Sequence, residues 1–346
     1  MIHILYQLFV LLLVGHARAK VPAVIVFGDS SVDAGNNNYI RTIGRSNWPP
    51  YGRDFEGGKP TGRFCNGRLT TDFISEAFGI KPVLPAYLDP SFSIKDFATG
   101  VTFASAGTGL DNVTSEQISV IPLWKELIYF HRYKRDLIKY MGENNTANTL
   151  GEAVYISSIG TNDFLVNYYQ LPSTRAKYTT VEEYQDFLVG LMGDFVSNIY
   201  RAGARKIALT GLPPFGCLPF VRSTNFMQGQ VCREDYNKVA SDYNAKLSSS
   251  VPKLNAKFSG IKVVYSDVYD ILADAIEKPF KYGFEEVALG CCGAGGFEMG
   301  LSCNNLNPIT CTDASKYIFW DAIHPTEKMN SILSDSTMKT SLSAFL

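Results

Sequence analysis

A serine, a histidine and an aspartate of this sequence are the residue types needed for nucleophilic catalysis by a hydroxyl group. Ser30 follows the apolar, β-branched stretch 21–27, which is typical of a buried strand. Ligands of open α/β sheets bind just beyond the carboxyl ends of the strands, so Ser30 is a candidate nucleophile. The alternative is that Ser30 caps the next helix, as many serines after a strand do.

A serine hydroxyl needs a general base at neutral pH, and few histidines are available for this role. The chain has four histidines: His3, His16, His131 and His324. The first two lie in an N-terminal segment that we expect to be removed. His131 stands among Arg and Lys residues in a segment with the pattern of an exposed helix. His324 follows Asp321 by three residues, so that a turn can bring the carboxylate to the imidazole. Taken by itself, this histidine would be interpreted as a turn residue before a proline.

Two further residues are placed to stabilise negative charge on a substrate. Gly107 and Asn162 follow the predicted strands 97–104 and 152–159. The carboxyl ends of parallel strands lie on one edge of a sheet, so these residues are expected beside Ser30. A glycine lets a backbone N–H approach a substrate closely, and an Asn amide donates a hydrogen bond without adding charge. Both suit an oxyanion hole.

Predicted strands alternate with predicted helices along the whole chain. Strands are expected at 21–27, 97–104, 152–159, 206–210 and 261–265, and helices at 69–78, 122–140, 181–201, 234–258, 268–276 and 326–333. This alternation predicts an α/β fold, a three-layer α/β/α sandwich with a mostly parallel central sheet. With no internal repeat and no low-complexity linker, residues 20–346 are expected to form a single domain.

The first 19 residues have the pattern of a secretory signal peptide. Residues 8–14 form an unbroken apolar run, and Ala17-Arg18-Ala19 fits the small-x-small cleavage rule, which predicts a mature start at Lys20. An uncleaved anchor is the alternative, because the positive charge before the apolar run is weak. No later stretch is long enough for a transmembrane helix. The formal charge of −1 gives no reason to expect a nucleic-acid partner, and a monomer is expected.

Secretion predicts that most of the seven cysteines form disulfides. Six lie in the C-terminal half, and Cys65 lies apart, so it is expected to be a free thiol. Cys217 and Cys232 enclose a loop rich in polar residues and are the best single pair; the pairing of the other four stays open. A zinc site is the alternative, but no C-x-x-C and no nearby histidine favours it. Asn112 and Asn144 begin N-x-T sequons and are predicted to be glycosylated in exposed loops.

Several rival motifs fail on individual residues. Asp29, Ser31 and Asp33 have the opening spacing of a calcium loop, but its glycine and closing glutamate are missing. Val32 stands where an α/β-hydrolase elbow requires glycine, and no G-x-G-x-x-G follows the first strand. We interpret Asp29, Asp33 and Asp163 as turn and cap residues rather than as a metal pair or a glycosidase pair. Neither a metal ion nor a cofactor is expected.

Together, the four segments resemble the conserved blocks of the GDSL esterase/lipases, or SGNH hydrolases. The matching segments are GDS at Ser30, SAG at Gly107, GTND at Asn162 and DAIHP at 321–325. LTGLPPFGCLP at 209–219 and CCGAGGFEMGLSCN at 291–304 resemble the plant branch of the family. The resemblance covers about residues 22–340. It departs from the family pattern at Ser31, where the family name has Leu, at Thr102, where Asn is usual, and at Cys65, where Ser is usual.

The resemblance implies a flavodoxin-like topology and a serine esterase mechanism. Ser30 would attack the ester carbonyl, His324 would accept and return the proton, and Asp321 would orient the imidazole. The N–H groups of Ser30 and Gly107, with the Asn162 amide, would form the oxyanion hole. The implied substrate is a small-molecule or polymer-linked acyl or acetyl ester in the apoplast or cell wall. An acyltransferase of cutin-synthase type and a non-catalytic binding protein are the alternatives.

Overall fold

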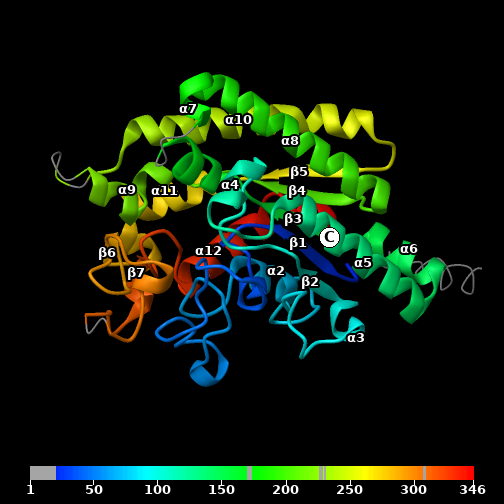
Figure 1. Ribbon diagram of the computed structural model, residues 1–346, viewed down its shortest axis with the longest axis horizontal. Helices are drawn as coiled ribbons and strands as arrows, with labels where there is room; N and C mark the ends of the chain where they lie inside the picture. The colour runs from blue at the N-terminus through cyan, green and yellow to red at the C-terminus, as the bar shows by residue number, and fades with distance from the viewer. Residues whose placement is uncertain (1–20, 170–173, 226–228, 230, 307–308) are drawn as a thin grey trace, which may run out of the picture.

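The central layer of the computed structural model, which describes residues 21–169, 174–225, 229, 231–306 and 309–346, is a parallel β-sheet (Figure 1). Among these residues, five strands pair in the order β2-β1-β3-β4-β5, and every pair is parallel. Their bounds are β1 (Val24–Gly28), β2 (Gly100–Thr102), β3 (Val154–Ser158), β4 (Lys206–Thr210) and β5 (Lys262–Ser266). The strand order is the flavodoxin-like one, so the predicted fold class is confirmed.

Helices cover both faces of the sheet. In Figure 1, α8 (Val181–Ala202) and α10 (Glu234–Lys257) lie on one side, and α2 (Thr70–Ala77) and α12 (Glu327–Lys339) lie on the other. The other helices of the described residues are α3 (Ile94–Phe97), α4 (Asn112–Gln117), α5 (Leu123–Met141), α6 (Glu143–Glu152), α7 (Thr174–Tyr178), α9 (Pro219–Thr224), α11 (Tyr269–Glu277) and the π-helix η3 (Asp163–Tyr168), with short 3-10 turns between elements.

The two faces of β1 belong to two different apolar clusters, as alternation along a strand requires. Ile25 and Phe27 pack in the larger cluster with α5, α8 and α10, whereas Val24 and Val26 pack in a smaller cluster with α2 and the C-terminal turn η9 (Leu342–Phe345). Burial on both faces explains why this strand is a continuous apolar run in the sequence.

The carboxyl ends of β1, β3, β4 and β5 lie side by side at one edge of the sheet, because the strands are paired in register. Gly28 of β1 pairs with Ser158 of β3, Ser158 pairs with Thr210 of β4, and Thr210 pairs with Ser266 of β5. The loops that follow these residues therefore start from one line. This line places segments that are distant in the sequence beside one another.

The structure differs from the prediction at two places in its strands. The expected strand 97–104 is only Gly100–Thr102, because Ser93 and Asp96 form a capping box that starts helix α3 just before it. In addition, a small parallel pair, β6 (Glu286–Gly290) with β7 (Tyr317–Phe319), was not predicted. This pair holds the C-terminal loop region against the site.

Three disulfides cross-link the C-terminal half: Cys217–Cys232, Cys291–Cys311 and Cys292–Cys303. The first is the predicted pair, and Cys65 is a buried free thiol as predicted. Burial raises the pKa of that thiol, which makes it an unreactive core residue.

The two sequons do not lie in loops, contrary to the prediction. Asn112 and Asn144 are exposed, but they are near the starts of helices α4 and α6. Thr114 and Thr146, which complete the sequons, are buried. Their glycosylation stays a prediction. The predicted signal peptide, residues 1–19, lies outside the described residues. Among the helices that the structure describes, none has the length and apolar character needed to cross a bilayer.

Candidate active site

Ser30, His324 and Asp321 form one hydrogen-bonded row at the carboxyl edge of the sheet. His324 Nε2 lies 2.8 Å from Ser30 Oγ, and His324 Nδ1 lies 2.8 Å from each Asp321 carboxylate oxygen. Asp321 is fully buried, His324 is 6% exposed and Ser30 is partly exposed. With Nδ1 donating to the carboxylate, Nε2 is left as an acceptor for the serine hydroxyl proton.

The turn that carries the acid and the base is closed by its own hydrogen bonds. Asp321 Oδ1 accepts the backbone N–H groups of Ile323 and His324 at 2.9 and 2.7 Å. The N–H of Trp320 donates to the carbonyl of His324. This turn explains the spacing of three residues, because the carboxylate that orients the imidazole also fixes the backbone that carries it.

The serine is held at the end of β1 by a turn that begins at Gly28. Gly28 has φ +141°, and a Cβ there would lie 2.0 Å from the carbonyl oxygen of Ser158, so no other residue fits. Asp29 donates its N–H to the same carbonyl, and its Oδ1 accepts both the N–H and the hydroxyl of Ser31. Asp29 is thus a turn residue, as predicted.

Gly107 and Asn162 reach this edge from the loops after β2 and β3. Gly107 has φ +91°, and a Cβ there would lie 2.1 Å from Ile118 Cδ1. Asn162 Nδ2 donates to the carbonyl of Thr108 at 3.0 Å, which ties the two loops together and leaves one amide hydrogen. Within the part of the chain that the structure describes, the N–H groups of Ser30 and Gly107 donate no hydrogen bond.

Two buried acids hold these loops through backbone N–H groups, as predicted. Asp33 accepts from the N–H groups of Gly35, Asn36 and Ala106. Burial raises the pKa of Asp33 to about 6, although these hydrogen bonds lower it. The backbone N–H groups therefore stabilise the ionised carboxylate of Asp33, whereas burial of the side chain opposes its ionisation.

Asp163 performs the same task on the other side of the site. It accepts from the N–H groups of Leu110 and Asp111 and from the Thr114 hydroxyl. Burial raises its pKa to about 7. The hydroxyl of the first sequon is therefore engaged in fixing the loop beside Gly107.

Tyr51 and Phe64 contact the acid and the base, and sequence reasoning missed both. The buried Tyr51 hydroxyl donates to Asp321 Oδ2 at 2.7 Å and accepts the N–H of Gly300 at 2.8 Å. The Phe64 ring packs on the His324 ring, with centroids 4.8 Å apart. Both come from the long loop 41–67. The density of aromatic residues in that loop was the available signal.

Glu126 is a third residue that was missed. Its side chain is fully buried although helix α5 was predicted to lie at the surface, and its Oε2 accepts the N–H of Gly28 at 3.0 Å. Burial raises its pKa well above the usual range, and Asp33 and Asp29 add to the rise. Its position three residues after Leu123 and four before Phe130, on the apolar stripe of α5, was the signal.

A cavity opens at Ser30 and His324 and continues beneath the sheet edge. Asn162, Ile323 and Ser158 line it near the row of Ser30, His324 and Asp321. Its volume is about 120 Å³. A substrate in this cavity would therefore meet the serine hydroxyl, the imidazole and the Asn162 amide together.

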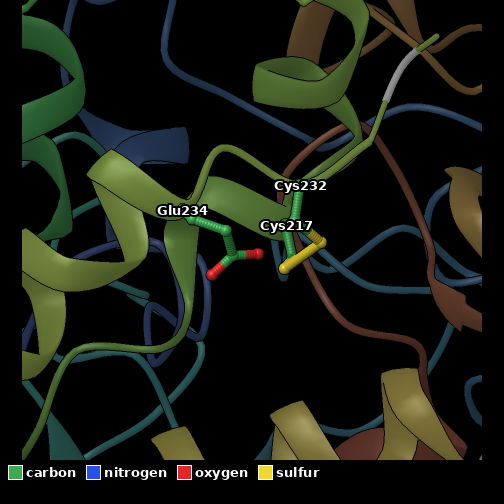
Figure 2. Close-up of side chains that lie close together, drawn as sticks. All are labelled: Cys217, Cys232 and Glu234. Atoms are coloured by element: carbon green, nitrogen blue, oxygen red, sulfur yellow. A yellow bond between two sulfur atoms is a disulfide. The ribbon is translucent and has the colours of Figure 1, made fainter. Parts of the chain in front are cut away.

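Other candidate groups lie away from this row. His131 is exposed on α5, as predicted; burial of part of its ring and the neighbouring Lys134 and Arg135 lower its pKa. Figure 2 shows Cys217, Cys232 and Glu234 close together, a combination that could hold a metal ion if the cysteines were thiolates. Their sulfur atoms are joined in a disulfide, which removes the thiolate ligands.

A hydroxyl, an imidazole and a carboxylate in one row at the carboxyl edge of a parallel sheet are the arrangement of a serine hydrolase of α/β type. The family model described as GDSL-like Lipase/Acylhydrolase matches residues 24–337. The chain belongs to this family, and it is a carboxylic ester hydrolase.

The chain is also similar over most of its length to plant proteins. Two GDSL esterase/lipases of Arabidopsis thaliana, At2g42990 and At4g26790, are each 55% identical to it over 327 residues, which are 94% of this chain and 93% of theirs. A third, At2g04570, is 53% identical over the same shares. The resemblance inferred from the four sequence blocks is confirmed.

Proposed function

We propose that the protein is a secreted serine esterase or lipase that works through an acyl-enzyme on Ser30. The Ser30 Oγ proton passes to His324 Nε2 as Oγ bonds to the ester carbonyl carbon. The C–O bond to the alcohol then breaks, and the alcohol oxygen takes the proton from His324. A water molecule repeats the sequence on the acyl-enzyme, which releases the acid and restores the hydroxyl. The observation that carries this proposal is the unbroken row from Ser30 through His324 to the buried Asp321.

The proposed oxyanion hole consists of the N–H groups of Ser30 and Gly107 and the Asn162 amide. Its support is that both N–H groups have no other described partner and that Asn162 lines the cavity beside Ser30. One such donor is worth about 10²–10³ in rate. Asn162→Ala should therefore lower kcat by that order without unfolding the protein.

A fluorophosphonate probe tests the nucleophile directly. We expect it to label Ser30 of the wild type and to leave Ser30→Ala unlabelled and inactive on p-nitrophenyl acetate. Peptide mapping of the labelled protein identifies the serine. If Ser30→Ala retained full esterase activity, or if the label lay on another residue, the proposed nucleophile would be wrong.

Secretion belongs to the same proposal. Three disulfides support an oxidising compartment, and the apolar run at 8–14 followed by Ala17-Arg18-Ala19 supports cleavage before Lys20. We expect the secreted protein to begin at Lys20. N-terminal sequencing of protein recovered from the medium tests this, and an intact N-terminus would contradict it.

A further inference from the structure

The cavity beside Ser30 does not stop at the rim of the sheet. Ser158 and Thr210, which end β3 and β4 in register, line it, and so do Ile156 and Ala208, which lie two residues further back and are also paired. Residues two apart point to the same face of a strand. The cavity therefore extends about 7 Å beneath the sheet, since each strand residue spans about 3.3 Å.

The side of the cavity opposite the sheet is formed by α2, α12 and η9. Ile74 of α2, Thr337 of α12 and Leu342 of η9 line it. The side chains at this depth are at most 4% exposed, so the cavity ends in the protein interior. The cavity lies between the sheet and the helices, where the side chains of the smaller apolar cluster leave a gap.

The lining is chemically suited to a hydrocarbon. Apart from Asp29 and His324 at the mouth, none of the described residues that line it is ionisable. A charged group placed at the depth of Ile156 and Ala208 would lose its water without gaining an ionic partner, which is costly. An alkyl chain would gain from leaving water at the same place.

The order of events at Ser30 decides which half of an ester lies in this cavity. The alcohol must leave while the acyl group is still bonded to Ser30, and water must then reach the acyl carbon. An alcohol chain in a cavity that ends inside the protein would be trapped behind that bond. An acyl chain can stay in place through both steps.

We propose that this cavity binds the acyl chain of the substrate, so that the enzyme prefers esters of alkyl acids with several methylene groups over acetyl esters. The inference rests on the proposed serine esterase function. Each methylene that enters the cavity should raise kcat/KM up to about fourfold, until the cavity is full.

Two matched series of esters test the proposal. In the first, p-nitrophenyl esters differ in acyl length; in the second, acetate esters differ in alkyl alcohol length. We expect kcat/KM to rise and then fall along the acyl series and to stay level along the alcohol series. If the enzyme hydrolysed acetates but kcat/KM stayed level or fell as the acyl chain became longer, the cavity would not be an acyl-binding site. The proposed esterase function would still stand. A rise along the alcohol series would overturn it as well. Absence of both hydrolysis and fluorophosphonate labelling would instead contradict the proposed function.

Variants at the deep end locate the binding site. Ala208→Leu should shorten the preferred acyl chain, with Ala208→Val showing a smaller shift. Ala77→Leu, on the exposed side of α2, is the matched control and should not change the preference. If Ala208→Leu did not fold, Leu342→Ala, which enlarges the same end, should lengthen the preferred chain. An unchanged preference in folded Ala208 and Leu342 variants would overturn the assignment.

Discussion

Asp321 accepts more hydrogen bonds than the one from His324 that the proposed mechanism requires. Besides His324 Nδ1, its carboxylate accepts two backbone N–H groups and the Tyr51 hydroxyl. Each donor favours one orientation of the carboxylate, and Tyr51 is the one that comes from a distant segment. Tyr51 is therefore a positioning residue in our interpretation, since it acts on the substrate only through Asp321 and His324.

Tyr51→Phe should lower kcat by about 10- to 100-fold, because a hydrogen bond to a charged group is worth about 1.5–3 kcal/mol. KM should change little, since the lost hydroxyl does not line the cavity. Tyr155→Phe is the matched control: it removes a buried hydroxyl that donates to the carbonyl of Leu150. Equal kcat values for the two variants in steady-state kinetics would contradict a role of Tyr51 at the site.

At the residue scale, the features that could be predicted from the sequence are those that depend on residue type and on spacing within a short segment. Ser30 after a strand and His324 three residues after Asp321 are local patterns. Tyr51 could not be predicted in the same way, because its partner Asp321 is 270 residues away and the contact depends on how a long loop folds. Glu126 was missed because a charged side chain on an amphipathic helix was taken to face water.

Among the elements, the cross-linked loop 291–311 supports the site from outside the main sheet. The N–H of Cys291 donates to the carbonyl of Phe319, and the N–H of Cys292 donates to that of Trp320, next to Asp321. Gly300, within the loop closed by Cys292–Cys303, donates to Tyr51. The disulfide thus constrains two of the contacts around the acid.

Replacing Cys292 and Cys303 together by serine should reduce both stability and activity. The chain-entropy model gives about 3 kcal/mol for a loop of this size, and displacement of Gly300 from Tyr51 should lower kcat about tenfold. The pair Cys217→Ser and Cys232→Ser is the control, because its loop is of similar length and does not contact Tyr51 or Asp321. Denaturant unfolding and kcat of the folded variants measure both effects. An equal loss of kcat in the two double variants would show that the loop has no particular role at the site.

The long helices and the central strands were predicted to within a few residues, since their periodicity is strong. Strand β4 was predicted with its observed bounds, and α8 and α10 differ by one residue at one end. The strand predicted at 97–104 contains β2 but is too long, and β6 was not predicted, because pairing with a neighbour, rather than their own sequence, defines these short strands. The sequons were assigned to loops for a different reason: the sequence of polar residues at the start of a helix is similar to that of a loop.

For the molecule as a whole, buried acids make stability depend on pH. The pKa of Asp163 is about 7 in the folded protein and 3.8 in the unfolded reference, so the folded protein holds an extra proton between these values. The free energy of unfolding that Asp163 contributes is fully present below pH 3.8 and is lost as the pH rises through 7. The total change is of the order of 4 kcal/mol.

Asp163→Asn tests this, because the amide does not titrate. The difference in unfolding free energy between wild type and variant should shift against the wild type as the pH is raised from 4 to 8. Denaturant unfolding at several pH values measures this difference. The part of the difference that does not change with pH reflects the altered hydrogen bonds of the variant. Parallel stability curves would mean that Asp163 titrates alike in both states.

The hydroxyl of Ser30 and the imidazole of His324 are separated by 294 residues of chain. A ribosome that adds about 5–20 residues per second needs on the order of 15–60 s to cross that interval. During that time the growing polypeptide carries Ser30 without the base that we propose for it. On this proposal, esterase activity can arise only after residue 324 has been added to the chain.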